Sequence, residues 1–506
     1  MKKIVITILA FACIVCLAGA AIQLYKISSS DEALPIYDGL APELVVKMLD
    51  FDATVSQYGN KTWQSTLAVE DINKVRETFE KCGYSLIDAP TIEGALNPPV
   101  VLGAGNRIVT LQKTSDSVRV VWDESHRDIF TLLFPNESTG TGVVTMAQIG
   151  TERTVEEDNP MNGMCYVYKL SDGSAVIIDG GHTSNSENLY NTIKTLDIAK
   201  DADGRYLITA WVLTHGHGDH YGALLTFAQK YRDQSDVKYL VYSFPIDGVS
   251  LSVQDCHVPS FVEYIDASYP GVKHIVPHAG LKYHFGNLTL EMLYTPELLT
   301  YVNYSNDTSL MFIADGNGGR VLHTGDAGER ASERTLMEYE EKAFNSNALQ
   351  ISHHGFVPHV NHPHDWDYLG KIYSYSNASI GLLPMGTRLV GDERNGRYSV
   401  LVWGTMINTH AAFMVDDRPS ETNLVLDTQA DFDRFVADVA AGTAQYETLY
   451  GYNGVNMIFG KNGMTTYIMS AETENMATVF TLSKQGMTVI SNELLSEWFE
   501  SSSLDK

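Results

Sequence analysis

Cysteine is scarce in this chain of 506 residues, and internal repeats and low-complexity tracts are absent from it. Only Cys82, Cys165 and Cys256 lie beyond an N-terminal apolar stretch. Three widely spaced thiols can form at most one disulfide, which excludes a small disulfide-stabilised fold. We expect these thiols to be buried as small apolar side chains.

Basic residues are also few, because 35 Lys and Arg stand against 62 Asp and Glu, for a formal net charge of −27. Proteins bind the phosphates of nucleic acids mainly through Lys and Arg, and no Lys/Arg cluster lies near the motifs described below. The charge therefore does not favour nucleic acid as a partner. The length predicts more than one domain.

The N-terminus combines two basic residues with a long apolar run. Lys2 and Lys3 precede the apolar residues 4–24, which include Ala18-Gly-Ala20 near their end. The two lysines predict that the start stays in the cytoplasm and the remainder is exported. Residues 1–30 are either a signal peptide cleaved after Ala20 or a membrane anchor, since about 20 apolar residues span a bilayer. Both alternatives predict an extracytoplasmic protein, secreted or anchored to the cytoplasmic membrane by its N-terminus.

Potential metal ligands are concentrated directly after the apolar residues 206–213. Four of them lie within six residues: His215, His217, Asp219 and His220. A tight turn spaced by glycines can direct the first two at one cation and the last two at another. Imidazole and carboxylate together suit transition metals rather than Ca²⁺ or Mg²⁺. We predict one or two divalent ions, with Zn as the first choice and Mn or Fe as alternatives.

Three further short apolar segments end in polar residues that can join this group. Asp179 follows the first segment, Asp326 follows the second, and His353 and His354 follow the third. Counted from the end of its strand, His354 is the better placed ligand of the histidine pair, and His353 is the alternative.

The order His-x-His-x-Asp-His at 215–220, Gly-Asp326 and His-His-Gly355 resembles the metallo-β-lactamase superfamily. The amino-acid sequence at residues 306–310, 323–326 and 351–355 is most similar to that of the hydrolase domain of the competence protein ComEC/Rec2 and its stand-alone relatives. The resemblance covers roughly residues 143–390. It implies an α/β fold, an αββα sandwich with the ligands on loops along one edge. It also implies that Asp179 orients the ligands from behind them and that Asp326 bridges two metal ions.

The chain departs from this resemblance at the first metal position. Most two-metal relatives carry another histidine before the hairpin that leads to the bridging aspartate, and here the sequence is Ser305-Asn306-Asp307-Thr308. Either Asn306, Asp307 or water completes the first position, or no metal binds there. A second departure is Phe356, where relatives commonly have serine, and this change concerns the substrate pocket.

A metal-bound water has a pKa near neutrality, so such a site needs no nucleophile from the protein. We expect Asp219 and Asp326 to be the catalytic residues, with Asp326 shared between two ions and Asp219 holding or accepting the proton. The resemblance favours hydrolysis of phosphodiester bonds, and export favours a small-molecule substrate outside the cell or a cell-surface polymer. The alternatives are a hydrolase of acyl, lactone or thioester bonds, and a non-catalytic surface-binding protein that contains metal.

Further histidines follow the ligand pair. His359, His362 and His364 belong either to a surface loop beside the site or to a loop that binds a substrate phosphate through imidazolium donors.

Hydrophobic periodicity and turn-forming stretches divide the chain into four parts. After the leader, residues 31–142 predict a small α+β module with a helix at 70–82 and strands at 107–113, 118–122 and 129–134. Residues 143–395 predict the hydrolase domain, with strands and helices alternating at 165–169, 175–178, 186–196, 206–213, 221–232 and 238–242. Residues 396–506 predict a β-rich extension with a helix at 431–441, which either completes the sandwich or forms an appended module.

Overall fold

The computed structural model describes residues 39–504, except for 115, 125–127, 136–141, 152–162, 245–255, 300–304, 356–366, 387–398, 407–408, 416–455, 460–463 and 472–473. Several predictions fall outside the described residues: the leader at 1–30, the helix at 431–441, Phe356, and the loop histidines His359, His362 and His364. Within the described part of the chain, every helix is too short or too polar to span a bilayer.

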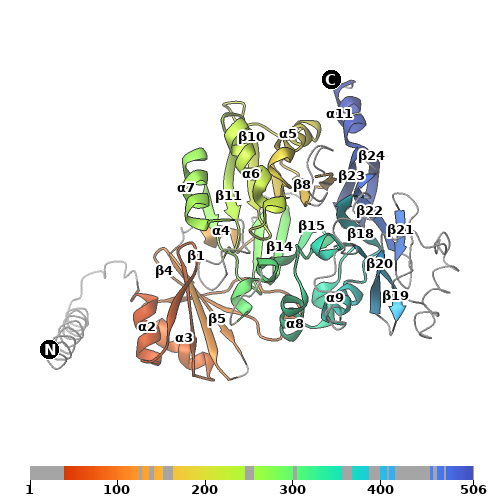
Figure 1. Ribbon diagram of the computed structural model, residues 1–506. Helices are drawn as coiled ribbons and strands as arrows, with labels where there is room; N and C mark the ends of the chain where they lie inside the picture. Colours follow the sequence, from red (N-terminus) through yellow and green to blue (C-terminus); the bar gives the residue numbers. More distant parts are fainter. Residues whose placement is uncertain are drawn as a thin grey trace.

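The N-terminal module is a six-stranded antiparallel sheet that carries two helices (Figure 1). Its strand order is β1-β2-β6-β5-β4-β3, with β1 Val55–Gly59, β2 Thr62–Leu67, β3 Ser85–Ile87, β4 Val100–Ala104, β5 Arg107–Lys113 and β6 Val118–Asp123. The helices are α2 Pro42–Leu49 and α3 Ile72–Lys81, and the Asp71 side chain caps α3 by accepting a hydrogen bond from the Asn73 amide. Buried residues of both helices pack on the sheet in one apolar core.

The prediction of a strand at 129–134 is wrong, because this segment contains the helix α4, Asp128–Leu132. Ile129, Leu132 and Leu133 are buried, and their spacing of three and four residues fits one face of a helix. They pack in one apolar cluster with residues of the predicted hydrolase domain and with Val101 and Ile108 of the N-terminal sheet, apart from the core that contains α2 and α3. The short apolar run was therefore ambiguous between strand and helix, and the neighbouring domain decides between them.

The domain that the sequence predicts to be a hydrolase is built from a sheet of 16 strands that folds into two layers. The first layer contains β12-β11-β10-β9-β8-β7-β23, with β24 paired to β23. Its strands are β7 Val144–Ile149, β8 Cys165–Lys169, β9 Ala175–Asp179, β10 Tyr206–Val212, β11 Ser235–Val241, β12 Lys273–Ile275, β23 Glu474–Ser483 and β24 Gly486–Leu494. The second layer contains β22-β18-β17-β16-β15-β14-β13, with β21 paired to β22. Its strands are β13 Lys282–Phe285, β14 Leu288–Tyr294, β15 Met311–Gly316, β16 Gly319–His323, β17 Ala348–Gln350, β18 Ile380–Gly386, β21 Asn456–Phe459 and β22 Met464–Ala471.

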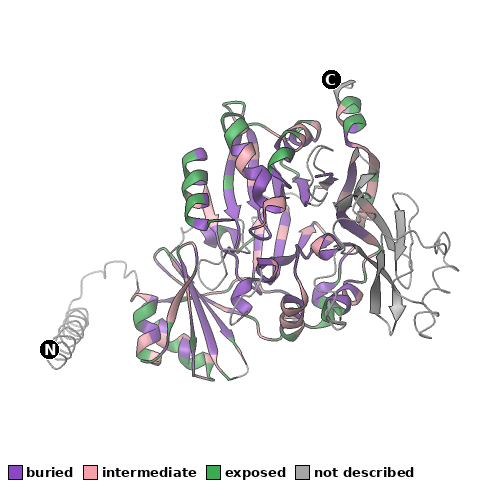
Figure 2. Cartoon of the chain, viewed as in Figure 1, coloured by how far each residue is buried: buried purple, intermediate pink, exposed green. Residues whose placement is uncertain are grey.

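Alternation along the strands explains how one layer is covered on both faces. In β8, Tyr166 and Tyr168 point into the core between the layers, whereas Cys165 and Val167 pack under helices. The helices of the first layer are α5 Ser186–Thr195, α6 Gly218–Tyr231, α7 Val258–Ser268 and α11 Leu495–Leu504. The helices beside the second layer are α8 Glu329–Glu338 and α9 Asp367–Ser376. Figure 2 shows buried strands in the interior and exposed outer faces on the helices.

The C-terminal strands complete the two layers, which settles an alternative that the sequence left open. β22 pairs in parallel with β18, and β23 pairs antiparallel with β7. Ala477, Val479, Phe480 and Leu482 of β23 are buried. A further two-stranded sheet is formed by β19 Ser399–Met406 and β20 Thr409–Val415.

A buried ion cluster joins the N-terminal module to the hydrolase domain. Nε2 of His278 lies 2.7 Å from Asp123 Oδ2 of β6, and Nδ1 lies 2.8 Å from Glu297 Oε2. Burial alone would lower the pKa of His278, but the carboxylates of Glu297 and Asp123 outweigh it and raise this pKa to about 10. Both ring nitrogens therefore donate to carboxylates across the junction, and the module is held by a buried imidazolium.

Candidate metal centre

The ligand loop begins where β10 ends and closes at the start of α6. His217 has an extended backbone and is the first residue before α6, so Asp219 and His220 lie in the first turn of the helix. This differs from the predicted helix start at residue 221. A carboxylate in the first turn is favoured by the helix dipole, which is a reason for the helix to begin before Asp219.

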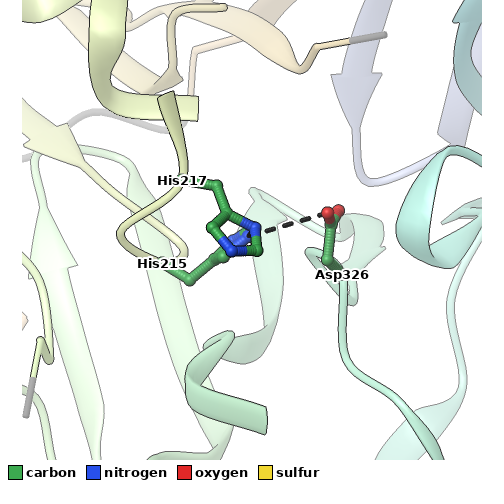
Figure 3. A group of neighbouring side chains, drawn as sticks. All are labelled: His215, His217 and Asp326. Carbon is green, nitrogen blue, oxygen red and sulfur yellow. Dashed lines mark hydrogen bonds and ion pairs between the residues drawn. The ribbon is translucent and has the colours of Figure 1, made fainter. Parts of the chain in front are cut away.

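Six predicted ligands come together in two groups. His215, His217 and Asp326 place one ligand atom each within 4.8 Å of one another, and Asp219, His220 and His354 do the same. Figure 3 shows the imidazoles of His215 and His217 directed toward the carboxylate of Asp326. The ligands come from three loops that are far apart in sequence: the loop after β10, the loop after β16 and the turn after β17.

Asp326 lies between the two groups. Its Oδ2 atom is 3.6 Å from Nε2 of His215, 3.3 Å from Nε2 of His220 and 3.4 Å from Nε2 of His354. Its other oxygen, Oδ1, is buried and has no hydrogen-bond partner among the described residues. One carboxylate thus faces ligands of both groups.

Asp179 fixes the second group from behind, as the resemblance implied. Its backbone has a φ of 55°, an uncommon value for a residue other than glycine. Oδ1 accepts from the Thr214 amide at 2.7 Å, and Oδ2 accepts from the Thr214 hydroxyl at 2.7 Å and from Nδ1 of His220 at 2.7 Å. Nδ1 of His220 therefore carries a proton, and Nε2 faces the site.

His354 is held in the same way. Its Nδ1 donates to the Pro384 carbonyl at 2.7 Å, so that Nε2 faces the site. His353 and His354 both adopt left-handed backbone conformations, with φ values of 49° and 55°. Two successive residues in this region cost conformational energy, and such strain is concentrated at functional sites.

The loop that carries Asp326 depends on a glycine and a buried amide. Gly325 has a φ of 54°, and a Cβ there would lie 3.0 Å from Ser309 Cβ and 3.1 Å from Thr214 Cβ. The Asp326 amide donates to the Ser309 hydroxyl at 3.0 Å. The side chain of Gln350 donates to the Gly325 carbonyl at 2.9 Å and accepts from the Thr324 amide at 2.7 Å. Ser309, Thr214 and Gln350 were not singled out from the sequence, because no motif spacing marks residues that support a loop through backbone contacts.

The charges of the cluster are strongly coupled. Burial alone would raise the pKa of Asp326. The neighbouring imidazoles, His220 first, outweigh burial and hold this pKa well below its usual range. The pKa of Asp219 is likewise lowered by His220 and His354 against the effect of burial. Burial, with help from His220, lowers the pKa of His215 well below its usual range, whereas carboxylates outweigh burial and raise the pKa of His354 to about 9.

The donor set fits transition-metal ions. Nε2 of His220 and Nε2 of His354 are 3.3 Å apart, and each ring already uses Nδ1 as a donor. Two nitrogens that bind one tetrahedral zinc at its usual bond length are also about 3.3 Å apart. The two groups are therefore candidate sites for two metal ions.

The remaining predicted residues are placed as follows. Asn306 and Asp307 lie in the turn Ser305–Thr308, where Asn306 contacts His353 and Asp307 forms an ion pair with Arg330. His353 is beside the ligand groups, and its pKa is lowered to about 4 by burial. The roles of Asp219 and Asp326 in catalysis stay predictions.

The residues of both ligand groups lie within the match to a known protein family. A family model described as the metallo-beta-lactamase superfamily matches residues 158–367. Among solved structures, the chain is similar to the metallo-beta-lactamase fold protein YhfI from Bacillus subtilis, with 15% identity, a TM-score of 0.32, and coverage of 48% of this chain and 86% of that one. A metallo-beta-lactamase HARLDQ motif mutant from Cronobacter sakazakii matches with 14% identity, a TM-score of 0.23, and coverage of 37% and 71%. CmlA, a diiron beta-hydroxylase from Streptomyces venezuelae, matches with 10% identity, a TM-score of 0.28, and coverage of 47% and 46%.

No curated protein matches the sequence. The narrower resemblance to ComEC/Rec2 stays a prediction. The family match and the two His/Asp groups together identify a metallo-beta-lactamase superfamily domain in this chain.

Proposed function

We propose that this protein is a metal-dependent hydrolase of phosphodiester bonds. The observation that carries the proposal is the position of Asp326, whose Oδ2 lies within 3.6 Å of histidines from both ligand groups. A shared carboxylate holds two cations at a short separation, as in the two-metal sites that clamp the attacking and leaving oxygens of a phosphoester. A single-metal site would need no such sharing.

Ions bound at the two groups would make water nucleophilic at neutral pH and polarise the scissile group. The residues of the chain supply the rest. Asp179 and the Pro384 carbonyl hold His220 and His354 in one tautomer. The Asp219 side chain keeps 14% exposure against 2% for Asp326, so Asp219 is the carboxylate that incoming water reaches. Its lowered pKa keeps it ionised, so that its oxygens stay hydrogen-bond acceptors that can hold that water.

For the substrate, we propose a small molecule outside the cell or a cell-surface polymer. Support comes from the apolar residues 4–24 after Lys2 and Lys3, which favour export, and from the net charge of −27, which disfavours nucleic acid. An antibody against residues after 39 should detect the protein outside the cytoplasmic membrane after cell fractionation. Recovery from the cytosol alone would contradict export, whereas full-length protein in the membrane fraction would distinguish an anchor from a cleaved signal peptide.

A paired assay tests the reaction class. Full-length protein loaded with Zn²⁺ or Mn²⁺ is assayed on bis-p-nitrophenyl phosphate and on a chromogenic thioester, with metal content measured on the same sample. The proposal predicts turnover of the phosphodiester, and loss of that turnover in His220→Ala. The matched control is His284→Ala, whose imidazole bonds Thr289 within the β13–β14 hairpin and belongs to neither ligand group. Turnover of the thioester alone would replace the phosphodiester proposal with an acyl hydrolase. Metal binding without turnover of either would indicate a non-catalytic protein.

A further inference from the structure

The turn Ser305–Thr308 lies where relatives of this domain were expected to carry another histidine, and the structure ties it to the ligand loops. The Leu310 amide donates to the Thr214 carbonyl at 2.9 Å, directly before His215. The Ser309 amide donates to the Asn306 carbonyl at 3.0 Å, and the Ser309 hydroxyl accepts from the Asp326 amide at 3.0 Å. The turn is thus joined on one side to the loop of His215 and on the other to Asp326.

The carboxylate of Asp307 is engaged by Arg330 and is therefore not the ligand that completes the first group. Its Oδ2 accepts from the Arg330 guanidinium at 3.1 Å, its side chain is 7% exposed, and its carbonyl accepts from the Tyr294 hydroxyl at 2.6 Å. A buried carboxylate that is paired with arginine is strongly held, because breaking the pair would leave a buried charge without its partner. The charge of Asp307 is therefore used to position the turn.

The side chain of Asn306 contacts His353 instead. Its Nδ2 donates to Nε2 of His353 at 3.1 Å, and its Oδ1 is buried without a hydrogen-bond partner among the described residues. A buried oxygen without a partner destabilises the fold unless another group satisfies it. His353 itself lies next to the ligand His354, and the centroids of the two rings are 6.2 Å apart. With Nε2 used as an acceptor for the amide, His353 holds the amide in one orientation.

From this arrangement we infer that the side-chain oxygen of Asn306 completes the first ligand group, His215, His217 and Asp326, and that His353 is the positioning residue for that amide. The inference deepens the proposed function, because it rests on metal binding at this site. The first group otherwise offers three protein ligands, whereas the second has Asp219, His220, His354 and the shared Asp326. An amide oxygen is neutral and is a weaker donor to zinc than imidazole, so the first position binds metal more weakly than the second.

The test measures metal binding on the full chain, by competition for Zn²⁺ with a chromogenic chelator and by the absorption spectrum of the Co²⁺ form. Asn306→Ala should weaken one of two equivalents by about 10–100-fold and leave the other unchanged. Asn306→His should tighten the same equivalent and shift the Co²⁺ spectrum. His353→Ala should weaken it less than Asn306→Ala, because the amide oxygen remains.

The matched control is Thr308→Val, which removes the hydroxyl that closes the same turn on the Ser305 carbonyl at 2.6 Å. It should leave both equivalents unchanged, and an equal loss in this variant would show that the turn and not the amide is responsible. Wild-type protein that binds two equivalents, together with Asn306→Ala that binds both as tightly, would overturn the inference and leave the proposed function intact. Wild-type protein that binds no metal would instead overturn the proposed function.

Discussion

The carboxylate of Asp179 lies 2.7 Å from Nδ1 of His220 and also binds the amide and hydroxyl of Thr214. One buried side chain thereby sets the tautomer of a ligand and the path of the loop that carries His215. Asp179 and His220 are both fully buried, so the contact between them is shielded from water and from salt.

Asp179→Asn should weaken metal binding at the second group by about 10–100-fold, because an amide cannot accept all three hydrogen bonds and orients the imidazole less firmly. Chelator competition on the purified full chain measures this affinity. Metal affinity equal to that of the wild type would show that Asp179 is not needed to orient His220.

Gly325→Ala should lower metal affinity at both groups, because the new Cβ would lie 3.0 Å from Ser309 Cβ and 3.1 Å from Thr214 Cβ and would displace Asp326. Gly204→Ala is the matched control, since Gly204 also has a positive φ, of 81°, but has no atom within 4 Å of the added Cβ. The control should lose about 1–2 kcal/mol of stability from backbone strain and keep its metal. Equal metal content in the two variants would contradict the packing argument.

The buried cluster of His278, Asp123 and Glu297 predicts a pH-dependent stability. The pKa of His278 is raised to about 10 in the folded protein, above its unfolded value of about 6.5. Its stabilisation is therefore complete below pH 6.5 and is lost as the pH rises toward 10. His278→Gln should lower the free energy of unfolding by on the order of 3–5 kcal/mol near pH 6, and the difference from wild type should shrink toward pH 10.

Chemical denaturation of both proteins between pH 6 and pH 10 measures that difference. His284→Gln is a useful comparison, because burial lowers the pKa of His284 and its removal should not give the same trend. A difference between His278→Gln and wild type that stays constant over this range would contradict an imidazolium at the junction.

The C-terminal strand β23 should be part of the folding unit. Phe480 is fully buried in the core between the layers, and its ring centroid lies 5.6 Å from that of Tyr467. Phe480→Ala should therefore cost about 3–5 kcal/mol, measured by chemical denaturation of the full chain. Ile490 on the neighbouring strand β24 is 58% exposed. Ile490→Ala should therefore change the free energy of unfolding by less than about 0.5 kcal/mol. Equal effects would mean that β23 is not part of the core.

The sequence predicts the metal ligands better than it predicts the residues that hold those ligands in place. His215, His217, Asp219 and His220 are adjacent in the sequence, and strand ends brought Asp326 and His354 to the same edge. The sequence left Asn306 and Asp307 as alternative ligands of the first group. The ion pair that engages Asp307 comes from Arg330, which is 23 residues from Asp307 and belongs to no motif. The pairing of β23 with β7 and the cluster around His278 also join segments more than 100 residues apart, which periodicity cannot reveal.

Metal content of Asp326→Ala tests the central claim, that one carboxylate serves both ligand groups. Wild type, Asp326→Ala and the control His284→Ala are loaded with Zn²⁺, freed of loose metal and analysed for zinc per chain, and the same samples are assayed on bis-p-nitrophenyl phosphate. We predict two equivalents and turnover in wild type and control, and a loss of metal from both positions together with loss of turnover in Asp326→Ala. Two retained equivalents and an unchanged rate in Asp326→Ala would contradict the shared carboxylate.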